Sequence, residues 1–155
     1  DVVEIYSPLT RSKDTYLTKL RAIRYLGRGT FTDCAISNMT QQFQSQTARD
    51  VKFAVVITDG HVTGSPCGGM KMQAERARDM GIKLFAVAPS EDVYEQGLRE
   101  IASPPHDLYR SNYTITPKDA LHIDENTIER IIKAMVRGTV LPRVQNRMRG
   151  DTREQ

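Results

Sequence analysis

Two short stretches of the chain are apolar almost without interruption, over residues 53–57 and 82–88. Continuous apolar runs of this length are typical of parallel strands that are covered on both faces. Between the two runs, helical spacing gathers apolar residues on one stripe, and Gly81 closes the helix. The pattern therefore predicts a right-handed strand, helix, strand crossover. The residues of the apolar stripe are Met70, Ala74, Ala77 and Met80.

Two helices are predicted before the first of these strands. Ser12 is expected to be the N-cap of a helix that carries Leu17, Leu20 and Ile23. The stretch Asp33–Gln46 has an apolar face at helical spacing and a polar face opposite it. Asn38 lies on the polar face and begins the sequon Asn38-Met39-Thr40, so we expect it to point to solvent, where a glycan could stand. The apolar face consists of Ile36, Met39 and Phe43.

Two more helices are predicted after the second strand. One, near Val93–Ala102, carries Tyr94, Leu98 and Ile101 and ends before Pro104-Pro105. The other begins at Asp124 as N-cap, with Ile123 and Ile128 as a hydrophobic staple. Its predicted buried stripe is Ile128, Ile131, Ile132 and Met135.

Helices alternating with buried strands predict an α/β fold, a doubly wound, mostly parallel sheet with helices on both faces. Short strands at Val3–Tyr6 and Asp107–Arg110 are expected to add to this sheet. The length of 155 residues suits one domain. We assign it to residues 1–135, because apolar periodicity is lost beyond them and helix-breaking glycine and proline appear. Residues 136–155 are predicted to be a disordered, arginine-rich tail.

The net positive charge of the chain comes from this tail. The net charge of +3 arises from five arginines and two acidic residues within 136–155, which leaves 17 basic and 17 acidic side chains elsewhere. A neutral, mixed surface lacks the one-sided field that a phosphate backbone requires, so nucleic-acid binding by the folded part is not expected. Membrane insertion is not expected either, because no apolar run approaches the ~18 residues that span a bilayer.

The two cysteines, Cys34 and Cys67, match no zinc-binding or redox spacing. They form either a disulfide or two buried thiols. The sequons at Asn38 and Asn112, of which Asn38 is expected to be the better glycosylation site, favour a secreted protein, and so favour oxidation. The histidines are too scattered for a catalytic set, and no nucleophile elbow is present.

Two loops carry the candidate chemistry. The apolar strand that ends in Val55-Val56-Ile57 runs into Thr58-Asp59-Gly60, which places Asp59 at the carboxyl edge of the sheet, where ligands bind. A carboxylate there suits a hard divalent cation. The glycine-rich loop from Gly27 to Asp33 contains Thr30 and Thr32 and leads directly into a helix. Taken alone, that loop is interpreted as a turn followed by a helix cap at Thr32 or Asp33.

Together, G-T-x-T before a helix, from Gly29 to Thr32, and V-V-I-T-D-G at the end of the next strand resemble von Willebrand factor A domains. The longer run from Gly29 to Pro89 is similar to the amino-terminal A domain of a collagen VI chain. The resemblance implies a non-enzymatic binding module with a metal-ion-dependent adhesion site for Mg²⁺. In this chain Thr30 and Asp59 would be ligands, and Thr32 would support the loop. It also implies a Cys34–Cys67 disulfide that joins the two metal-site loops.

The chain departs from the family pattern because D-x-S-x-S, which supplies most of the Mg²⁺ ligands, is absent. The resemblance therefore implies a partial fold that lacks its first strand, first helix and second strand. An unpaired sheet edge and uncovered apolar faces are expected. Thr30 and Asp59 alone are a poor octahedral site, so we expect Mg²⁺ to bind this chain weakly or not at all.

The resemblance implies a secreted protein of the extracellular matrix. Its expected partners are other collagen VI chains and matrix proteins, with integrin-type receptors possible and microfibril assembly as the role. Arg149-Gly150-Asp151 spells an integrin-recognition tripeptide, but it lies in the tail, which matches nothing in the family. Two alternatives are a fragment without function of its own, and a Mg²⁺-dependent hydrolase that uses Asp59.

Overall fold

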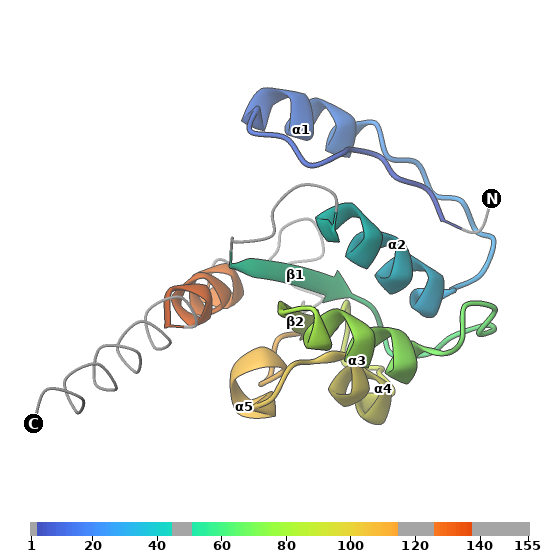
Figure 1. Ribbon diagram of the computed structural model, residues 1–155, viewed down its shortest axis with the longest axis vertical. Helices are drawn as coiled ribbons and strands as arrows, with labels where there is room; N and C mark the ends of the chain where they lie inside the picture. The colour runs from blue at the N-terminus through green and yellow to red at the C-terminus, as the bar shows by residue number, and fades with distance from the viewer. Residues whose placement is uncertain (1–2, 45–50, 115–125, 138–155) are drawn as a thin grey trace, which may run out of the picture. The chain divides into compact units, whose positions relative to one another are not determined.

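The computed structural model describes residues 3–44, 51–114 and 126–137 (Figure 1). The chain divides into two compact units, which we describe separately. The first comprises residues 1–52 and 61–82, and the second comprises residues 53–60 and 83–155. The first unit contains helices α1 (Lys13–Arg21), α2 (Thr32–Gln44) and α3 (Met70–Asp79). Almost all of strands β1 (Lys52–Ile57) and β2 (Ile82–Val87) belongs to the second unit, with α4 (Glu95–Ile101), α5 (His106–Tyr109) and a helix over residues 126–137.

The two predicted strands form the sheet of the second unit. β1 and β2 are parallel neighbours, which confirms the α/β prediction, and a parallel bridge from Ala88 to Thr114 continues the sheet beyond β2. β2 is buried along nearly its whole length, as predicted. β1 is not: the side chains of Val55 and Ile57 are 42% and 53% exposed, so the expectation of full burial is wrong for this strand. Within the described residues β1 pairs on one edge only.

Aromatic side chains around Phe85 form the core of the second unit. Its ring centroid lies 4.8 Å from that of Tyr109 and 6.0 Å from that of Phe53. Leu98 and Ile101 of α4 are fully buried, as their helical spacing predicts. Each buried aromatic ring removes on the order of 150–250 Å² from water, so this cluster contributes much of the unit's stability.

In the first unit, α2 packs along α3 (Figure 1). Ile36 of α2 and Ala74 and Ala77 of α3 are buried, which confirms the predicted apolar faces at these positions. Met80 was expected on the same stripe, but it is the C-cap of α3 and is 36% exposed. The Ser12 cap of α1 is confirmed, since its side chain accepts a hydrogen bond from the Thr15 amide.

Neither of the two short strands predicted at the ends of the sheet forms. Val3–Tyr6 contains no strand, because no neighbouring strand in the described part of the chain supplies the backbone partners that a strand needs. Asp107–Arg110 lies mainly in α5. Pro105 is the N-cap of this helix, and its carbonyl accepts hydrogen bonds from the amides of Leu108 and Tyr109. The aromatic and apolar residues suggested a strand, but the local backbone bonds close a helical turn.

The buried stripe of the last helix differs from the predicted one. Ile131 is buried and Met135 is half-buried, whereas Ile128 and Ile132 are 40% and 53% exposed. Thr127 and Ala134 are buried instead, so the buried face is rotated around the helix. The helix continues through residue 137, beyond the predicted domain boundary at 135. The predicted cap at Asp124, the staple partner Ile123 and residues 138–155 of the predicted tail lie outside the described residues.

Candidate functional site

The threonine loop before α2 is fixed by reciprocal hydrogen bonds with Thr63. The Thr30 amide donates to Thr63 Oγ1 over 2.8 Å, and the Thr63 amide donates to the Thr30 carbonyl over 3.0 Å. Gly29 has φ +97°, and a β-carbon there would lie 2.6 Å from Thr63 Oγ1. Both the backbone conformation and the close neighbour therefore require glycine. The Thr30 side chain is exposed, whereas Thr32 is buried at the first residue of α2.

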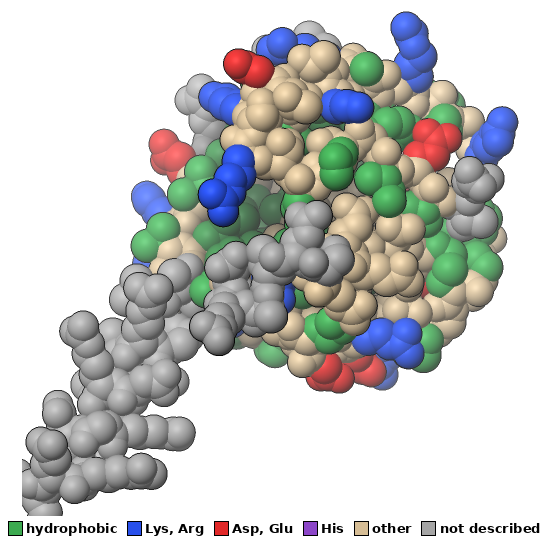
Figure 2. Space-filling view, turned by 45° about the horizontal axis from the view of Figure 1, so that its top comes forward, with side chains coloured by type: hydrophobic (Ala, Val, Ile, Leu, Met, Phe, Trp, Pro, Cys, Tyr) green, Lys and Arg blue, Asp and Glu red, His purple; other side chains and the backbone are tan. Residues whose placement is uncertain are grey.

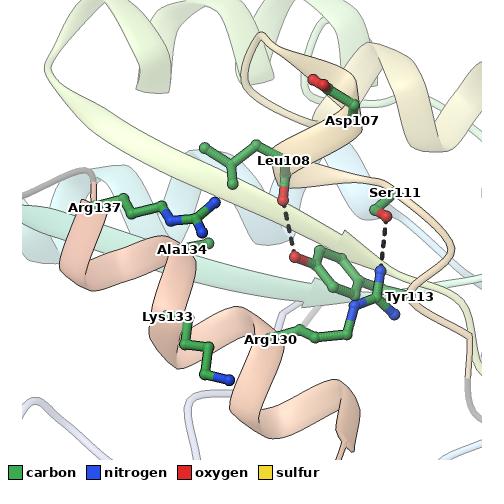
Figure 3. A pocket seen from close by; sticks show the side chains of 8 residues that line it. All are labelled: Asp107, Leu108, Ser111, Tyr113, Arg130, Lys133, Ala134 and Arg137. Carbon is green, nitrogen blue, oxygen red and sulfur yellow. Dashed lines mark hydrogen bonds between the residues drawn. The ribbon is translucent and has the colours of Figure 1, made fainter.

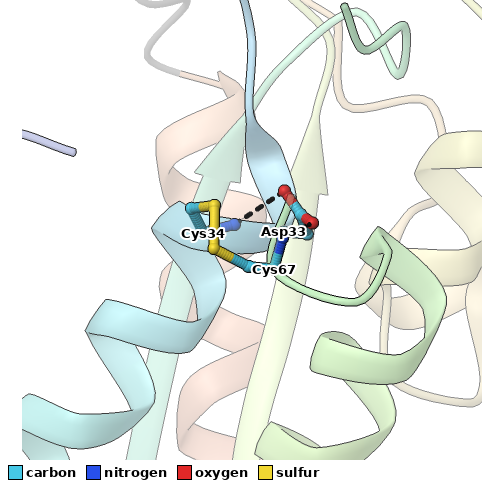
Figure 4. A group of neighbouring side chains, drawn as sticks. All are labelled: Asp33, Cys34 and Cys67. Atoms are coloured by element: carbon cyan, nitrogen blue, oxygen red, sulfur yellow. Dashed lines mark hydrogen bonds between the residues drawn. A yellow bond between two sulfur atoms is a disulfide. The ribbon is translucent and has the colours of Figure 1, made fainter. Parts of the chain in front are cut away.

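The carboxylate of Asp33 connects the start of α2 to the loop before α3 (Figure 4). Its Oδ1 accepts a hydrogen bond from the Cys34 amide over 2.9 Å. Its Oδ2 accepts from the amides of Cys67 over 2.7 Å and Gly69 over 3.1 Å. Asp33 is only 1% exposed, so these three donors replace the water that a buried carboxylate loses. The sequence indicated Asp33 only as a possible helix cap, because hydrogen bonds to residues 34 and 36 positions away leave no signal in local spacing.

A disulfide joins the same two segments. Cys34 Sγ and Cys67 Sγ are 2.05 Å apart, with the Cα atoms 5.1 Å apart. The prediction of this disulfide is confirmed, and the alternative of two buried thiols is excluded. The cysteines are separated by 33 residues, so the cross-link stabilises the fold by roughly 3–4 kcal/mol in the chain-entropy treatment. The threonine loop, the start of α2 and the loop before α3 are therefore held together by one covalent and several polar links.

Asp59 lies in the second unit, just after β1. The Asp59 carbonyl accepts a hydrogen bond from the Tyr94 amide over 2.8 Å, and the residue is half-buried. Gly60 follows with φ +85°, and a β-carbon there would collide with the Tyr94 carbonyl oxygen. The Thr58 amide donates to the Val87 carbonyl over 3.1 Å, which extends the pairing of β1 and β2 up to this loop. As predicted, Asp59 is placed at the carboxyl end of a parallel strand.

One group of side chains with potential metal ligands lies close together among the described residues. Asp33, Cys34 and Cys67 have potential ligand atoms within 4.8 Å of one another. However, the two sulfurs are bonded to each other and the Asp33 carboxylate accepts three amide donors, so this cluster has a structural role. Thr30 belongs to the first unit and Asp59 to the second. These two side chains fall short of the near-octahedral oxygen shell that Mg²⁺ requires.

The two sequons lie in different surroundings. Asn38 is half-buried within α2, where its Oδ1 accepts a hydrogen bond from Gln42 Nε2 over 3.4 Å. Thr40 of the same sequon is buried, and its hydroxyl donates to the Ile36 carbonyl over 2.8 Å. Asn112 is exposed in the loop after α5.

The sequence-family model of the von Willebrand factor type A domain matches residues 1–126, so the chain belongs to this family. Within it, the chain is similar to collagen alpha-1(VI) chains. It is 37% identical to that of Xenopus laevis over 139 residues, which covers 85% of this chain and 13% of the relative. It is 34% identical to the human protein over 144 residues, which covers 85% of this chain and 14% of the human protein. Mouse matrilin-4 is 33% identical over 112 residues, which covers 68% of this chain and 17% of matrilin-4.

The predicted membership in the von Willebrand A family and the resemblance to collagen VI are thus confirmed. These collagen VI relatives are alpha-1 chains, and the present chain spans about one seventh of their length. Domains of this family often bind a metal ion. No helix in the described part of the chain is long and apolar enough to cross a membrane.

Proposed function

We propose that this chain is a protein-binding A domain of an extracellular matrix protein and has no enzymatic activity. The observation that carries the proposal is the family match over residues 1–126, together with relatives that are collagens and matrilins. The disulfide supports secretion, because such bonds persist in oxidising compartments. The cross-linked loops of the first unit support a binding role, because rigid loops lose little conformational entropy when a partner binds.

More particularly, we propose that the chain corresponds to the amino-terminal A domain of a collagen VI chain of the alpha-2 type. The run from Gly29 to Pro89, with the threonine loop and the Asp59 loop, supports this assignment. Its partners would be other collagen VI chains and matrix proteins, and also integrin-type receptors, and its role would be microfibril assembly in the extracellular matrix.

We propose that Mg²⁺ has only a secondary role in adhesion by this chain. Thr30 and Asp59, with Thr32 supporting the loop, form a partial adhesion site, and Mg²⁺ would contribute fully only where further oxygen ligands are supplied. Because two ligands hold Mg²⁺ poorly, adhesion of this chain is expected to be nearly independent of the ion. Titration calorimetry is expected to show no micromolar Mg²⁺ affinity. Such an affinity, abolished by Asp59→Ala but retained in Asp92→Ala, would overturn this part of the proposal.

The binding function is tested with chain secreted from cultured cells and applied to immobilised collagen VI microfibrils. Saturable binding is expected, with less than a twofold change when EDTA replaces Mg²⁺. Fibrils of an unrelated collagen serve as the specificity control. A folded chain that binds neither surface would support a fragment without function of its own. Mg²⁺-dependent phosphatase activity lost in Asp59→Ala would support the hydrolase instead.

A further inference from the structure

A small basic pocket lies in the second unit, beside the helix over residues 126–137 (Figure 3). Its volume is about 210 Å³. Arg130, Lys133 and Arg137 line it from the helix, at spacings of three and four residues that place them on one face. The opposite wall comes from α5 and the loop after it, including Leu108 and Tyr113. The pocket is distinct from the threonine loop and from the Asp59 loop, since it shares no lining residue with them.

Arg130 is held in position by two interactions before any ligand arrives. Its guanidinium carbon lies 4.7 Å from the centroid of the Tyr113 ring, and its NH2 group donates to Ser111 Oγ over 2.7 Å. Tyr113 is itself fixed, since it is buried and its hydroxyl donates to the Leu108 carbonyl over 2.9 Å. Burial raises the pKa of Tyr113 and the charge of Arg130 opposes this shift, so the hydroxyl stays protonated at neutral pH. A guanidinium fixed in this way loses little rotamer freedom on binding an anion.

The charge of the lining is unbalanced. Three basic side chains and the single carboxylate of Asp107 give it a net charge of +2. Arg110 is paired with Glu95, whereas neither Lys133 nor Arg137 takes part in an ion pair with the described residues. Figure 3 shows both side chains extending from the helix beside the fixed Arg130. Close positive charges without a counterion favour an anionic ligand, and guanidinium forks favour planar carboxylates.

We propose that this pocket binds a glutamate or aspartate side chain from an acidic segment of a protein partner. The lining combines the three cations with apolar surface from Leu108, Tyr113 and Ala134. Apolar walls suit the methylene groups of a glutamate side chain, whereas the hydroxyl-bearing rings of a sulfated polysaccharide would leave polar groups unpaired against them. The volume accommodates one such side chain rather than a folded element. The proposal does not rest on the metal site or on the collagen VI assignment.

The test uses the full chain and fluorescein-labelled hexaglutamate, followed by fluorescence anisotropy at low ionic strength. The pocket variant combines Lys133→Gln with Arg137→Gln and is expected to bind the peptide about tenfold more weakly. The matched control combines Lys71→Gln with Arg99→Gln, which removes the same charges from exposed helix positions outside the pocket. We expect its affinity to stay within twofold of the unmodified chain. Circular dichroism of both variants checks that the fold is retained.

An equal loss in the two variants would overturn the proposal, because it would show a response to net charge alone. So would dextran sulfate binding that depends on Lys133 and Arg137 while hexaglutamate binding does not. If the pocket variant fails to fold, amide chemical shifts of the unmodified chain decide the question. Hexaglutamate is expected to move the resonances of residues 108–113 and 130–137, and shifts confined to other residues would contradict the assignment.

Discussion

At the residue scale, the carboxylate of Asp33 is an ionisable group that is almost fully buried. A buried carboxylate is costly unless hydrogen bonds replace its hydration, and here three backbone amides do so. Two of these amides, from Cys67 and Gly69, lie on the loop that the disulfide also holds. Asp33 therefore supports the geometry of the loops through its hydrogen bonds to their backbone.

Replacement of Asp33 by asparagine is expected to destabilise the fold by about 2–4 kcal/mol. The substitution removes the negative charge and places an NH₂ group against amide donors, so buried N–H groups lose their acceptor. Urea unfolding under non-reducing conditions measures the change. Asp79→Asn, at an exposed position at the end of α3, is the matched control and should shift stability by less than about 0.5 kcal/mol. Equal stability of the two variants would contradict the role assigned to Asp33.

Gly29→Ala is expected to be more destabilising than Gly81→Ala. Both glycines have positive φ, +97° and +84°, so both variants carry the cost of the left-handed region, about 1–2 kcal/mol. Only at Gly29 would the new β-carbon meet a neighbour, Thr63 Oγ1 at 2.6 Å, whereas nothing lies within 4 Å at Gly81. The difference between their urea midpoints therefore isolates the contact between the two loops. Identical midpoints would show that Thr63 moves aside freely.

Of the two sequons, we expect Asn112 to be glycosylated more fully than Asn38. Asn112 is exposed in a loop, whereas Asn38 is half-buried in a helix and Thr40 beside it is buried. An attached glycan requires an accessible asparagine, so this reverses the order expected from the sequence. Mass spectrometry of chain secreted by cells, before and after enzymatic deglycosylation, gives the occupancy of each site. Asn112→Gln and Asn38→Gln provide paired controls, and greater occupancy at Asn38 would contradict the prediction.

At the element scale, the segment predicted as a strand near residue 108 shows how a buried charge can organise a short helix. Arg110 follows α5 and is only 4% exposed. Its Nε and NH2 groups donate to the two carboxylate oxygens of Glu95, each over 3.0 Å. Its NH1 group donates to the Tyr113 carbonyl over 2.8 Å. One guanidinium therefore connects the end of α5, the start of α4 and the loop beyond, and no pattern of apolar residues could have predicted this.

Glu95→Gln is expected to destabilise the chain by about 1–2 kcal/mol, because it leaves the buried Arg110 guanidinium without its charged partner. The loss is small because the Glu95 side chain is 49% exposed, so water already weakens its interaction with Arg110. Thermal unfolding followed by circular dichroism measures the loss. Glu91→Gln, which removes the same charge from an exposed loop position, is the control. A similar decrease in both variants would assign the effect to net charge.

At the scale of the whole molecule, apolar side chains remain at the surface, and Figure 2 shows several groups of them on one face. Val55 and Ile57 lie two residues apart on β1, so their side chains share one face of the strand. Ile128, Ile132 and Val136 follow one another at intervals of four along the last helix and are 40–57% exposed. Contiguous exposed apolar surface commonly marks a site of interaction with another protein. This agrees with the expectation, drawn from the family resemblance, of uncovered apolar faces.

Combining Val55→Thr with Ile57→Thr is expected to reduce the fluorescence of a bound apolar dye by about half while the unfolding temperature changes by only a few degrees. Threonine preserves strand propensity but removes apolar surface that water already reaches. Dye titration and thermal unfolding are measured on the same sample. Val62→Thr, at an exposed loop position, should leave the dye signal nearly unchanged. A large fall in unfolding temperature would mean that the two β1 side chains are packed against something in solution.

The sequence by itself determined the elements whose signals are local. Apolar runs located β1 and β2, helical spacing located α2, α3 and α4, and the Ser12 cap began α1. The family motifs correctly led to the Cys34–Cys67 disulfide. These features were predictable because periodicity, capping and glycine placement act over a few neighbouring residues.

Only the tertiary structure decided which surfaces are covered and which polar groups meet. The Asp33 carboxylate and the Arg110 guanidinium find partners far away in the chain, and the basic pocket unites a helix with a loop some twenty residues before it. The rotated face of the last helix and the exposed face of β1 depend on which elements are present to pack against. Burial is a property of neighbours in space, so a pattern along the chain shows which residues can be buried, and packing determines which are.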